Sequence, residues 1–385
     1  MALPSIFEQL QQLVAIPSVS SHSANWDMGN RKVVEQLAEW LEPLGFQTEI
    51  IPVIENGVEL VNKANLIATL GSGSGGLVLA GHTDTVPYDE NRWQSDPFKL
   101  CETDNKWFGL GATDMKGFFP VAIEAAKAFA GTPLQQPLII LATADEESSM
   151  SGARALAELG KPKARYAVIG EPTSLVPIRM HKGIMMEEVT VEGQSGHSSN
   201  PALGHNAMES MHVVISDLLE FRRELQAKHN NPGFGVPTPT INLGCIHGGD
   251  NPNRICGQCK MQFDLRALPG MDNVELRSQI DKRLHRLSEE LGTPILRNTL
   301  FGGVPAFEEP ANSQLVQVAE KLTGTTAESV AFATEAPFMQ QLGMETIVMG
   351  PGSIDQAHQP NEFIATEQIQ PAVDTIKALI REFCL

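Results

Sequence analysis

The sequence predicts an α/β fold, in which a catalytic domain built on a mostly parallel central sheet carries an inserted, smaller α+β domain. Two near-continuous apolar segments, PLIILATADEE (137–147) and RYAVIGEP (165–172), are typical of strands buried on both faces. Helical patterns alternate with such strands through the first half, which indicates βαβ units. After about residue 178, apolar and acidic residues alternate instead, as in a sheet with one face in water.

The first half also predicts helices, strands and one turn by local pattern. NLIATL (65–70) and LVLAGHTD (77–84) are expected as strands. The glycine run GSGSGG (71–76) between them predicts a hairpin turn, because neither a helix nor a GK[ST] signal follows it. Apolar residues at helical spacing predict four helices, at 5–16, 30–45, 115–131 and 151–160.

The later part of the chain predicts an inserted domain, followed by a second segment of the catalytic domain. Its expected elements are a strand at 185–193, a helix at 205–229, strands at 239–246 and 255–266, and a helix at 272–291. A βαββαβ order with one open face describes a ferredoxin-like lid or dimerisation domain at 179–302. A buried strand at 345–352 and a final helix at 367–383 restore α/β character, so the catalytic domain is expected to be discontinuous, at 1–178 and 303–385.

Composition narrows the class of partners. The 28 basic and 46 acidic residues give a formal net charge of −18 without a basic block, so neither nucleic acid nor a membrane surface is expected as a partner. No apolar run approaches the ~20 residues that span a bilayer. The N-terminal segment lacks the features of a signal peptide, and the five cysteines are sparse. Both features predict reduced thiols and a cytoplasmic protein.

Polar residues collect where the predicted strands end. In open α/β sheets, ligands lie beyond the carboxyl ends of the strands. The residues expected at that edge are His82, Asp84, Asp114, Glu146, Glu147, Glu171 and His358. The negative charges of such a group of acids repel one another, which raises the pKa values of the carboxyl groups unless cations neutralise the charge. Mixed imidazole and carboxylate ligands suit zinc, and cobalt or manganese as well.

Each of these residues also has a structural interpretation when taken alone. Glu146 and Glu147 could be the acidic start of the helix that follows them. Asp114 could be a helix cap, Glu171 a strand terminus, and His358 a surface residue in a loop. The metal hypothesis depends on their gathering at one edge of one sheet.

Five motifs carry these residues, namely GHTDTVP (81–87), GLGATDMKG (109–117), ATADEE (142–147), IGEP (169–172) and GPGSIDQAHQPNE (350–362). In this order they resemble the motif set of the M20 family of dizinc amidases and peptidases. The resemblance runs along essentially the whole chain and includes the inserted domain. Longer strings, GQSGHSSNPALG (193–204) among them, are similar to those of the bacterial family members that act on N2-acetyl-L-ornithine.

The resemblance implies two divalent metal ions. Zn2+ is the metal expected first, and Co2+ or Mn2+ would also suit the site. It implies that His82 and Glu171 bind one ion and that Glu147 and His358 bind the other. Asp114 would bridge the two ions. By the same resemblance, Asp84 would orient the His82 ring through a hydrogen bond.

Glu146 would be the general base. The resemblance assigns His197 to the active site of the neighbouring subunit of a homodimer, where it would stabilise the oxyanion. Asn253 and Arg266 match positions that hold the substrate carboxylate, and Lys182 is a further candidate for that task. Glu335, in ATEAPF, is expected either to contact the substrate amine or to be a buried structural acid.

The implied reaction removes the acetyl group from N2-acetyl-L-ornithine, a small N-acyl amino acid, in arginine biosynthesis. The metal motifs do not separate this reaction from that of a desuccinylase, a broader aminoacylase or a dipeptidase of the same family. A non-catalytic binding protein would lack a ligand or the base, and all seven positions are filled. No G-x-G-x-x-G follows the first strands, which argues against a dinucleotide-binding protein.

Overall fold

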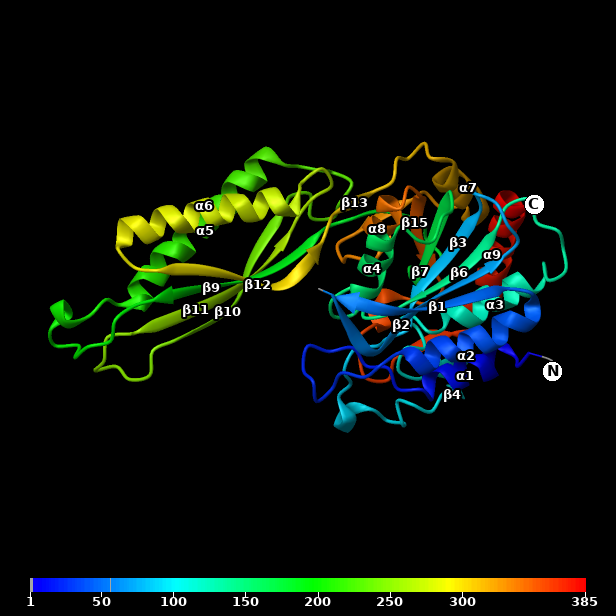
Figure 1. Ribbon diagram of the computed structural model, residues 1–385, viewed down its shortest axis with the longest axis horizontal. Coiled ribbons are helices and arrows are strands. Elements are labelled where there is room, and N and C mark those ends of the chain that lie inside the picture. Colours follow the sequence, from blue (N-terminus) through cyan, green and yellow to red (C-terminus); the bar gives the residue numbers. More distant parts are fainter. Residues whose placement is uncertain (1–2, 56) are drawn as a thin grey trace. The chain divides into compact units, whose positions relative to one another are not determined.

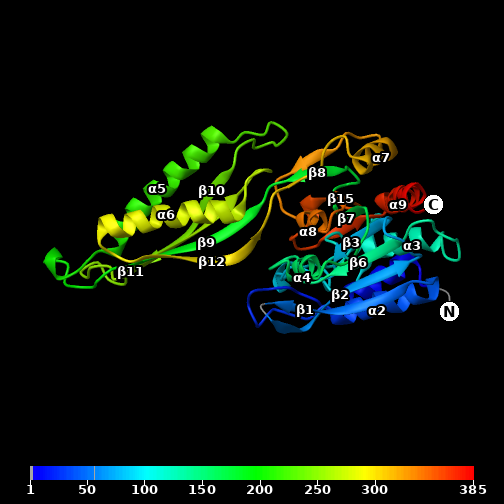
Figure 2. The same ribbon diagram turned by 45° about the horizontal axis from the view of Figure 1, so that its top comes forward.

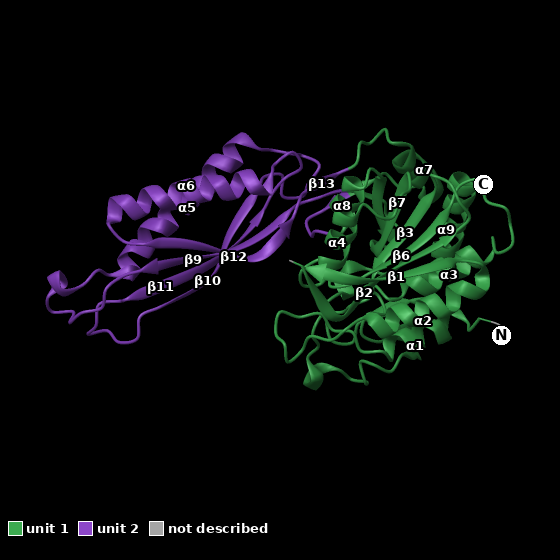
Figure 3. Cartoon of the chain, in the orientation of Figure 1, with its two compact units in different colours: residues 1–179, 309–328, 335–385 green, residues 180–308, 329–334 purple. Residues whose placement is uncertain are grey.

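The computed structural model describes residues 3–55 and 57–385, which form two compact units (Figure 1, Figure 3). Unit 1 comprises Met1–Arg179, Glu309–Glu328 and Glu335–Leu385, and unit 2 comprises Met180–Glu308 and Ser329–Thr334. The inserted unit therefore includes 303–308 and 329–334 in addition to the stretch expected for it. The catalytic and lid roles assigned to the two parts stay predictions.

The central sheet of unit 1 is parallel at its centre, which confirms the α/β prediction. Six of its strands lie in the order β1-β2-β6-β3-β7-β15. Strand β3 is parallel to β6 and β7, and β7 to β15, whereas β2 is antiparallel to β1 and β6. The bounds are β1 (Gln47–Glu55), β2 (Val58–Leu70), β3 (Leu77–His82), β6 (Leu138–Thr143), β7 (Tyr166–Pro172) and β15 (Glu345–Gly350). Because β3, β6 and β7 are parallel neighbours, their carboxyl ends share one edge.

The predicted hairpin at the glycine run is wrong. Strands β2 and β3 are not neighbours, because β6 lies between them. The run passes the beginning of β6, where the Leu77 amide donates to the Pro137 carbonyl oxygen (3.0 Å). Gly76 has a φ of +88°, and a Cβ there would lie 2.0 Å from that oxygen. The glycine therefore permits a close passage over a third strand, which the local sequence does not distinguish from a hairpin turn.

Helices cover this sheet and build the main core. Helix α3 packs against α1 and α9, and α4 packs against α8 and β1. The bounds are α1 (Ile6–Val14), α2 (Arg31–Leu41), α3 (Phe118–Lys127), α4 (Ser151–Leu159), α7 (Gln314–Thr323), α8 (Ala336–Gln341) and α9 (Ile369–Cys384). A small second sheet has the order β16-β5-β4, with β4 (Cys101–Thr103), β5 (Lys106–Phe108) and β16 (Phe363–Ala365). Within the described residues, we find no helix with the length and apolar character to cross a membrane.

Unit 2 has the predicted βαββαβ order, with two helices on one face of an antiparallel sheet (Figure 2). The sheet order is β10-β11-β9-β12. The elements are β9 (Ile184–Glu192), α5 (Ala207–Lys228), β10 (Thr240–Gly248), β11 (Gln258–Arg266), α6 (Asn273–Leu291) and β12 (Ile295–Val304). Residues of β9 such as Met185 and Val189 alternate into the core beneath the helices. Three short strands, β8 (Ile178–His181), β13 (Phe307–Glu308) and β14 (Glu328–Val330), lie where the chain passes between the units.

Candidate metal centre

His82 is the last residue of β3, and its ring is buried at the carboxyl edge of the sheet. Its Nδ1 is 3.0 Å from the carbonyl oxygen of Asp84 and 3.6 Å from that residue's Oδ1. In the neutral ring, an Nδ1–H that donates to Asp84 leaves a lone pair on Nε2. This Nε2 faces Asp114 Oδ1 at 3.1 Å, so the free nitrogen points at the other acidic residues.

Asp114 lies between the two predicted histidine ligands. Its Oδ1 is 3.1 Å from His82 Nε2, and its Oδ2 is 3.4 Å from His358 Nε2. Burial raises the pKa of the Asp114 carboxyl, but hydrogen bonds from His358 and His82 outweigh burial, and the pKa lies well below its usual range. One carboxylate that offers a different oxygen to each imidazole has the arrangement of a bridging ligand.

His358 and Glu147 complete the second side of the cluster. His358 Nε2 lies 3.1 Å from Glu147 Oε1 and 3.0 Å from its Oε2. Hydrogen bonds to Asp114 and Glu147 raise the pKa of His358 to about 10. His82, Asp114 and Glu147 offer ligand atoms that all lie within 4.8 Å of one another. Side chains from three segments that are distant in sequence are therefore brought within the span of metal ligands.

Glu171 and Glu146 add further acid to the same place. Glu171 Oε1, near the end of β7, is 3.9 Å from His82 Nε2. Burial and the charge of Asp114 raise the pKa of Glu171 well above its usual value. Burial and the charge of Glu171 do the same for Glu146. Oxygen and imidazole donors that are crowded in this way fit divalent cations, because added positive charge removes the repulsion.

Asp84 is placed to do more than orient the His82 ring. Its Oδ1 accepts a hydrogen bond from the Glu146 amide (3.2 Å), and its Oδ2 accepts one from the Glu147 amide (3.1 Å). The contact to the ring is made chiefly by the Asp84 carbonyl oxygen. The Asp84 carboxylate thus holds the loop that carries the predicted base and one predicted ligand, a role that the sequence did not indicate.

Glu362 is a further residue that the sequence reasoning missed. Its buried carboxylate accepts hydrogen bonds from the amides of Gly111 (2.9 Å), Thr113 (2.7 Å) and Asp114 (2.9 Å). Three amides on one carboxylate fix the backbone from which the Asp114 side chain extends. The acid stands four residues after His358, in the same predicted motif, and that position was the available signal.

Glu335 is fully buried in unit 1. Its Oε2 accepts a hydrogen bond from Thr143 Oγ1 (2.9 Å), and its Oε1 has no hydrogen-bond partner in the described part of the chain. Burial raises the pKa of this carboxyl to about 7. Neither expected role is excluded by these contacts, and the assignment stays a prediction.

The four remaining candidates lie in unit 2, in two pairs. Burial and the nearby charge of Arg266 lower the pKa of Lys182, so these two cations are neighbours. The Lys182 ammonium also donates to the Thr238 carbonyl oxygen (2.7 Å). His197 and Asn253 lie on adjacent segments, because the Ser198 amide donates to the Asn253 carbonyl oxygen (3.1 Å).

The family comparison places most of the chain within one family model. Residues 78–382 match the model described as peptidase family M20/M25/M40. An acetylornithine deacetylase of Pasteurella multocida is 47% identical over 382 residues, which cover 99% of each chain. An acetylornithine deacetylase of Salmonella arizonae is 48% identical over 382 residues, covering 99% of this chain and 98% of that one.

Solved structures show the same fold at low identity. An M20 family metallo-carboxypeptidase of Sulfolobus solfataricus superposes with a TM-score of 0.77 at 19% identity and covers 98% of this chain and 99% of its own. A dinuclear metal-binding M20 peptidase of Bacillus subtilis superposes with a TM-score of 0.66 at 15% identity, covering 98% of this chain and 97% of its own. At these identities the likeness concerns the fold.

Proposed function

The chain belongs to peptidase family M20/M25/M40, and from that premise we propose that it hydrolyses N2-acetyl-L-ornithine to L-ornithine and acetate in arginine biosynthesis. It is a metal-dependent amidohydrolase by its family and by its full-length relatives. The identity of nearly one half to acetylornithine deacetylases along the whole chain supports this substrate over others. The arrangement of Asp114 between His82 and His358 supports the chemistry.

The contacts within the cluster support the ligand sets that the family resemblance implies. His82 and Glu171 would hold one cation, Glu147 and His358 the other, and Asp114 both. Zinc suits these donors best, and cobalt or manganese also fit. Two divalent cations, when bound, supply the positive charge that polarises an amide carbonyl and acidifies a water.

Glu146 would move the proton. It stands beside Glu147 in the chain, and its amide is held by Asp84. Its carboxylate would take a proton from the attacking water and deliver it to the amine that leaves. A carboxylate that is not itself a metal ligand suits this exchange, because it can accept the proton in one step and release it in the next.

The remaining candidate residues would bind the rest of the substrate. Arg266, with Lys182 beside it, suits the α-carboxylate, because both are cations. Asn253 would assist, and Glu335 would either contact the substrate amine or serve as a buried structural acid. His197 would stabilise the oxyanion in the active site of the other subunit of a homodimer. The enzyme would act in the cytoplasm, without a nucleic-acid or membrane partner.

The shared site can be tested by mixing two inactive variants, Glu146→Ala and His197→Ala. A mixed dimer would hold one site with both residues intact, so a random mixture should regain roughly a quarter of wild-type activity. A mixture that stays inactive although mixed dimers form would show that His197 does not act across subunits.

The substrate is tested by one comparison on the purified, zinc-loaded protein. N2-acetyl-L-ornithine, N-acetylmethionine and N-succinyl-diaminopimelate are assayed side by side for kcat/KM. The proposal expects the ornithine derivative to be preferred by at least about tenfold, a difference of about 1.4 kcal/mol in transition-state binding. Preference for either of the others would replace the substrate while leaving the amidohydrolase assignment intact.

A further inference from the structure

One buried ion pair lies beside the loop that carries Glu146 and Glu147. Lys63, on β2, is 5% exposed, and Asp145, which follows β6, is 4% exposed. The Lys63 Nζ is 2.5 Å from Asp145 Oδ1. Neither residue belongs to the predicted ligand set. Burial of a charge pair is costly unless further hydrogen bonds satisfy it, so the rest of the network decides what the pair does.

Asp145 is tied to three separate parts of unit 1. Its Oδ1 also accepts a hydrogen bond from Ser20 Oγ (2.8 Å), and its Oδ2 accepts one from Ser151 Oγ at the start of α4 (3.3 Å). Its carbonyl oxygen accepts from the amides of Ser149 (3.0 Å) and Met150 (2.6 Å), which closes a turn over 145–150. Every hydrogen-bonding group named here fixes the residue that immediately precedes Glu146.

The backbone conformation of Asp145 sets the direction in which the chain continues to Glu146. Its φ is +58°, in the left-handed region that non-glycine residues seldom occupy. Such a conformation persists only where surrounding contacts determine it. The contacts of the Asp145 carboxylate with Lys63, Ser20 and Ser151 supply that determination.

Lys63 remains a cation in this setting. Burial lowers the pKa of its ammonium, but the charge of Asp145, with hydrogen bonds to Asp145 and Asp27, more than offsets burial, and the net pKa is raised. The Asp27 Oδ1 lies 2.8 Å from Nζ. The ammonium thus joins the loop to β2 and to the segment that contains Asp27.

We propose that Lys63 and Asp145 are positioning residues that hold the turn 145–150, so that Glu146 is free to act while Glu147 faces His358. The Asp84 carboxylate holds the amides of Glu146 and Glu147 from the other side. Because Glu146 and Glu147 have different tasks, the backbone between them must stay in one conformation. The contacts of Asp145 on one side and of the Asp84 carboxylate on the other hold it there. This inference rests on the proposed function, whose base and ligand it explains.

The test is Lys63→Met in the full chain, loaded with zinc for kinetics and with cobalt for visible absorption. A displaced base should lower kcat by about 10- to 100-fold and change KM by less than about threefold. The cobalt bands should shift, because the Glu147 ligand moves with the turn. The matched control is Lys161→Met, which removes an exposed ion pair with Glu49 (2.8 Å) and should change neither reading.

Ser20→Ala is the second variant, and it decides the matter if Lys63→Met fails to fold. It removes the hydrogen bond to Asp145 and the contact with Ser148 Oγ of the same turn. It should lower kcat several-fold with a smaller shift of the same bands. A folded, metal-loaded Lys63→Met or Ser20→Ala protein with wild-type kcat and spectrum would overturn the inference. If the wild type does not hydrolyse N2-acetyl-L-ornithine, the proposed function fails, and the cobalt spectra still test the positioning.

Discussion

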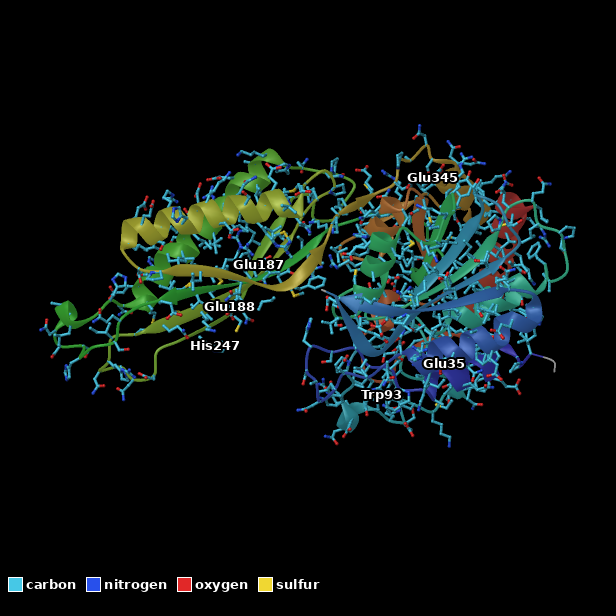
Figure 4. All side chains as sticks on the ribbon, viewed as in Figure 1. Glu35, Trp93, Glu187, Glu188, His247 and Glu345 are labelled. Atoms are coloured by element: carbon cyan, nitrogen blue, oxygen red, sulfur yellow. The ribbon has the colours of Figure 1, made fainter. Side chains whose placement is uncertain are left out.

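Both units bury carboxylates, but they balance the charge in different ways. In unit 2, Glu187 of β9, which is labelled in Figure 4, is fully buried. It lies between Arg277 (Nε to Oε1, 2.7 Å) and Arg297 (Nη1 to Oε2, 2.5 Å). In unit 1, the side chains that face Asp114 and Glu147 are the imidazoles of the candidate metal centre, which bind metal in their neutral form. Two guanidinium groups satisfy a buried carboxylate permanently, whereas two histidines among several acids leave an excess of negative charge.

This difference separates a structural network from a binding site. Arginine is always protonated and supplies its charge as part of the fold. The acids of unit 1 lack sufficient positive charge around them, because burial and mutual repulsion raise the pKa values of Glu146 and Glu171. Cations from solution would supply the missing positive charge.

Removal of metal should have the largest effect. Dialysis against a chelator should lower activity by more than about 1,000-fold, because the positive charge that polarises the substrate is lost. Zinc or cobalt should restore the rate. Steady-state turnover measured with the metal content of the same sample checks this, and full activity in metal-free protein would contradict it.

The adjacent acids 146 and 147 should separate catalysis from metal binding. Glu146→Gln should retain bound zinc while kcat falls by about 100- to 10,000-fold, since the proton-transfer group is gone. Glu147→Gln should instead weaken zinc binding, which a competitive chelator titration measures. If Glu146→Gln loses metal and Glu147→Gln keeps it, the two roles are reversed.

Arg297→Met should show that the network of unit 2 is structural. Loss of one arginine leaves Glu187 buried with incomplete compensation, and the free energy of unfolding should fall by roughly 3 kcal/mol. Metal content should not change. Urea denaturation measures the first quantity, with Arg286→Met, at a half-exposed position on α6, as the control expected to cost less than about 1 kcal/mol. A loss of metal in Arg297→Met would contradict the separation of the two regions.

Glu335→Gln should have a smaller effect that depends on pH. The pKa of Glu335 is raised from 4.5 to about 7, so its favourable contribution to stability is complete below pH 4.5 and is lost as the pH rises through 7. Between pH 4.5 and pH 8, metal-free wild type should therefore lose on the order of 3 kcal/mol more than the variant.

The thermal midpoint of both proteins at several pH values measures this difference. Glu35→Gln, at an exposed position on α2, is the control and should leave the pH profile unchanged. An unchanged profile in Glu335→Gln together with a raised KM would favour the alternative role of Glu335 in binding the substrate amine.

The fold was predictable where pattern and burial agree. The apolar runs of β6 and β7 predict strands buried on both faces, and the alternation in β9 predicts a strand with one buried face. The neighbours of β2 were not predictable, because a glycine run permits a hairpin and a close crossing equally. The βαββαβ order implied a last strand, but the position of β12 was not predicted, because its register shifts between Thr299 and Phe301 and again before Val304 break the period of two.

For the site, the sequence indicated which residues gather but not what holds them. His82 and Glu171 end strands, and their meeting follows from sheet geometry. The anchoring contacts of Asp84, Glu362 and Lys63 join residues by backbone amides and by ion pairs distant in sequence. Such contacts leave no periodic signal, so only the structure reveals them.

The measurement that tests the central claim most directly is the metal content per chain at equilibrium with dilute zinc, for the wild type and for Asp114→Asn. We expect about two zinc ions per wild-type chain and about one or fewer in the variant, because one carboxylate would serve both positions. A wild-type protein that hydrolyses its substrate at full rate with fewer than about one ion per chain would contradict it.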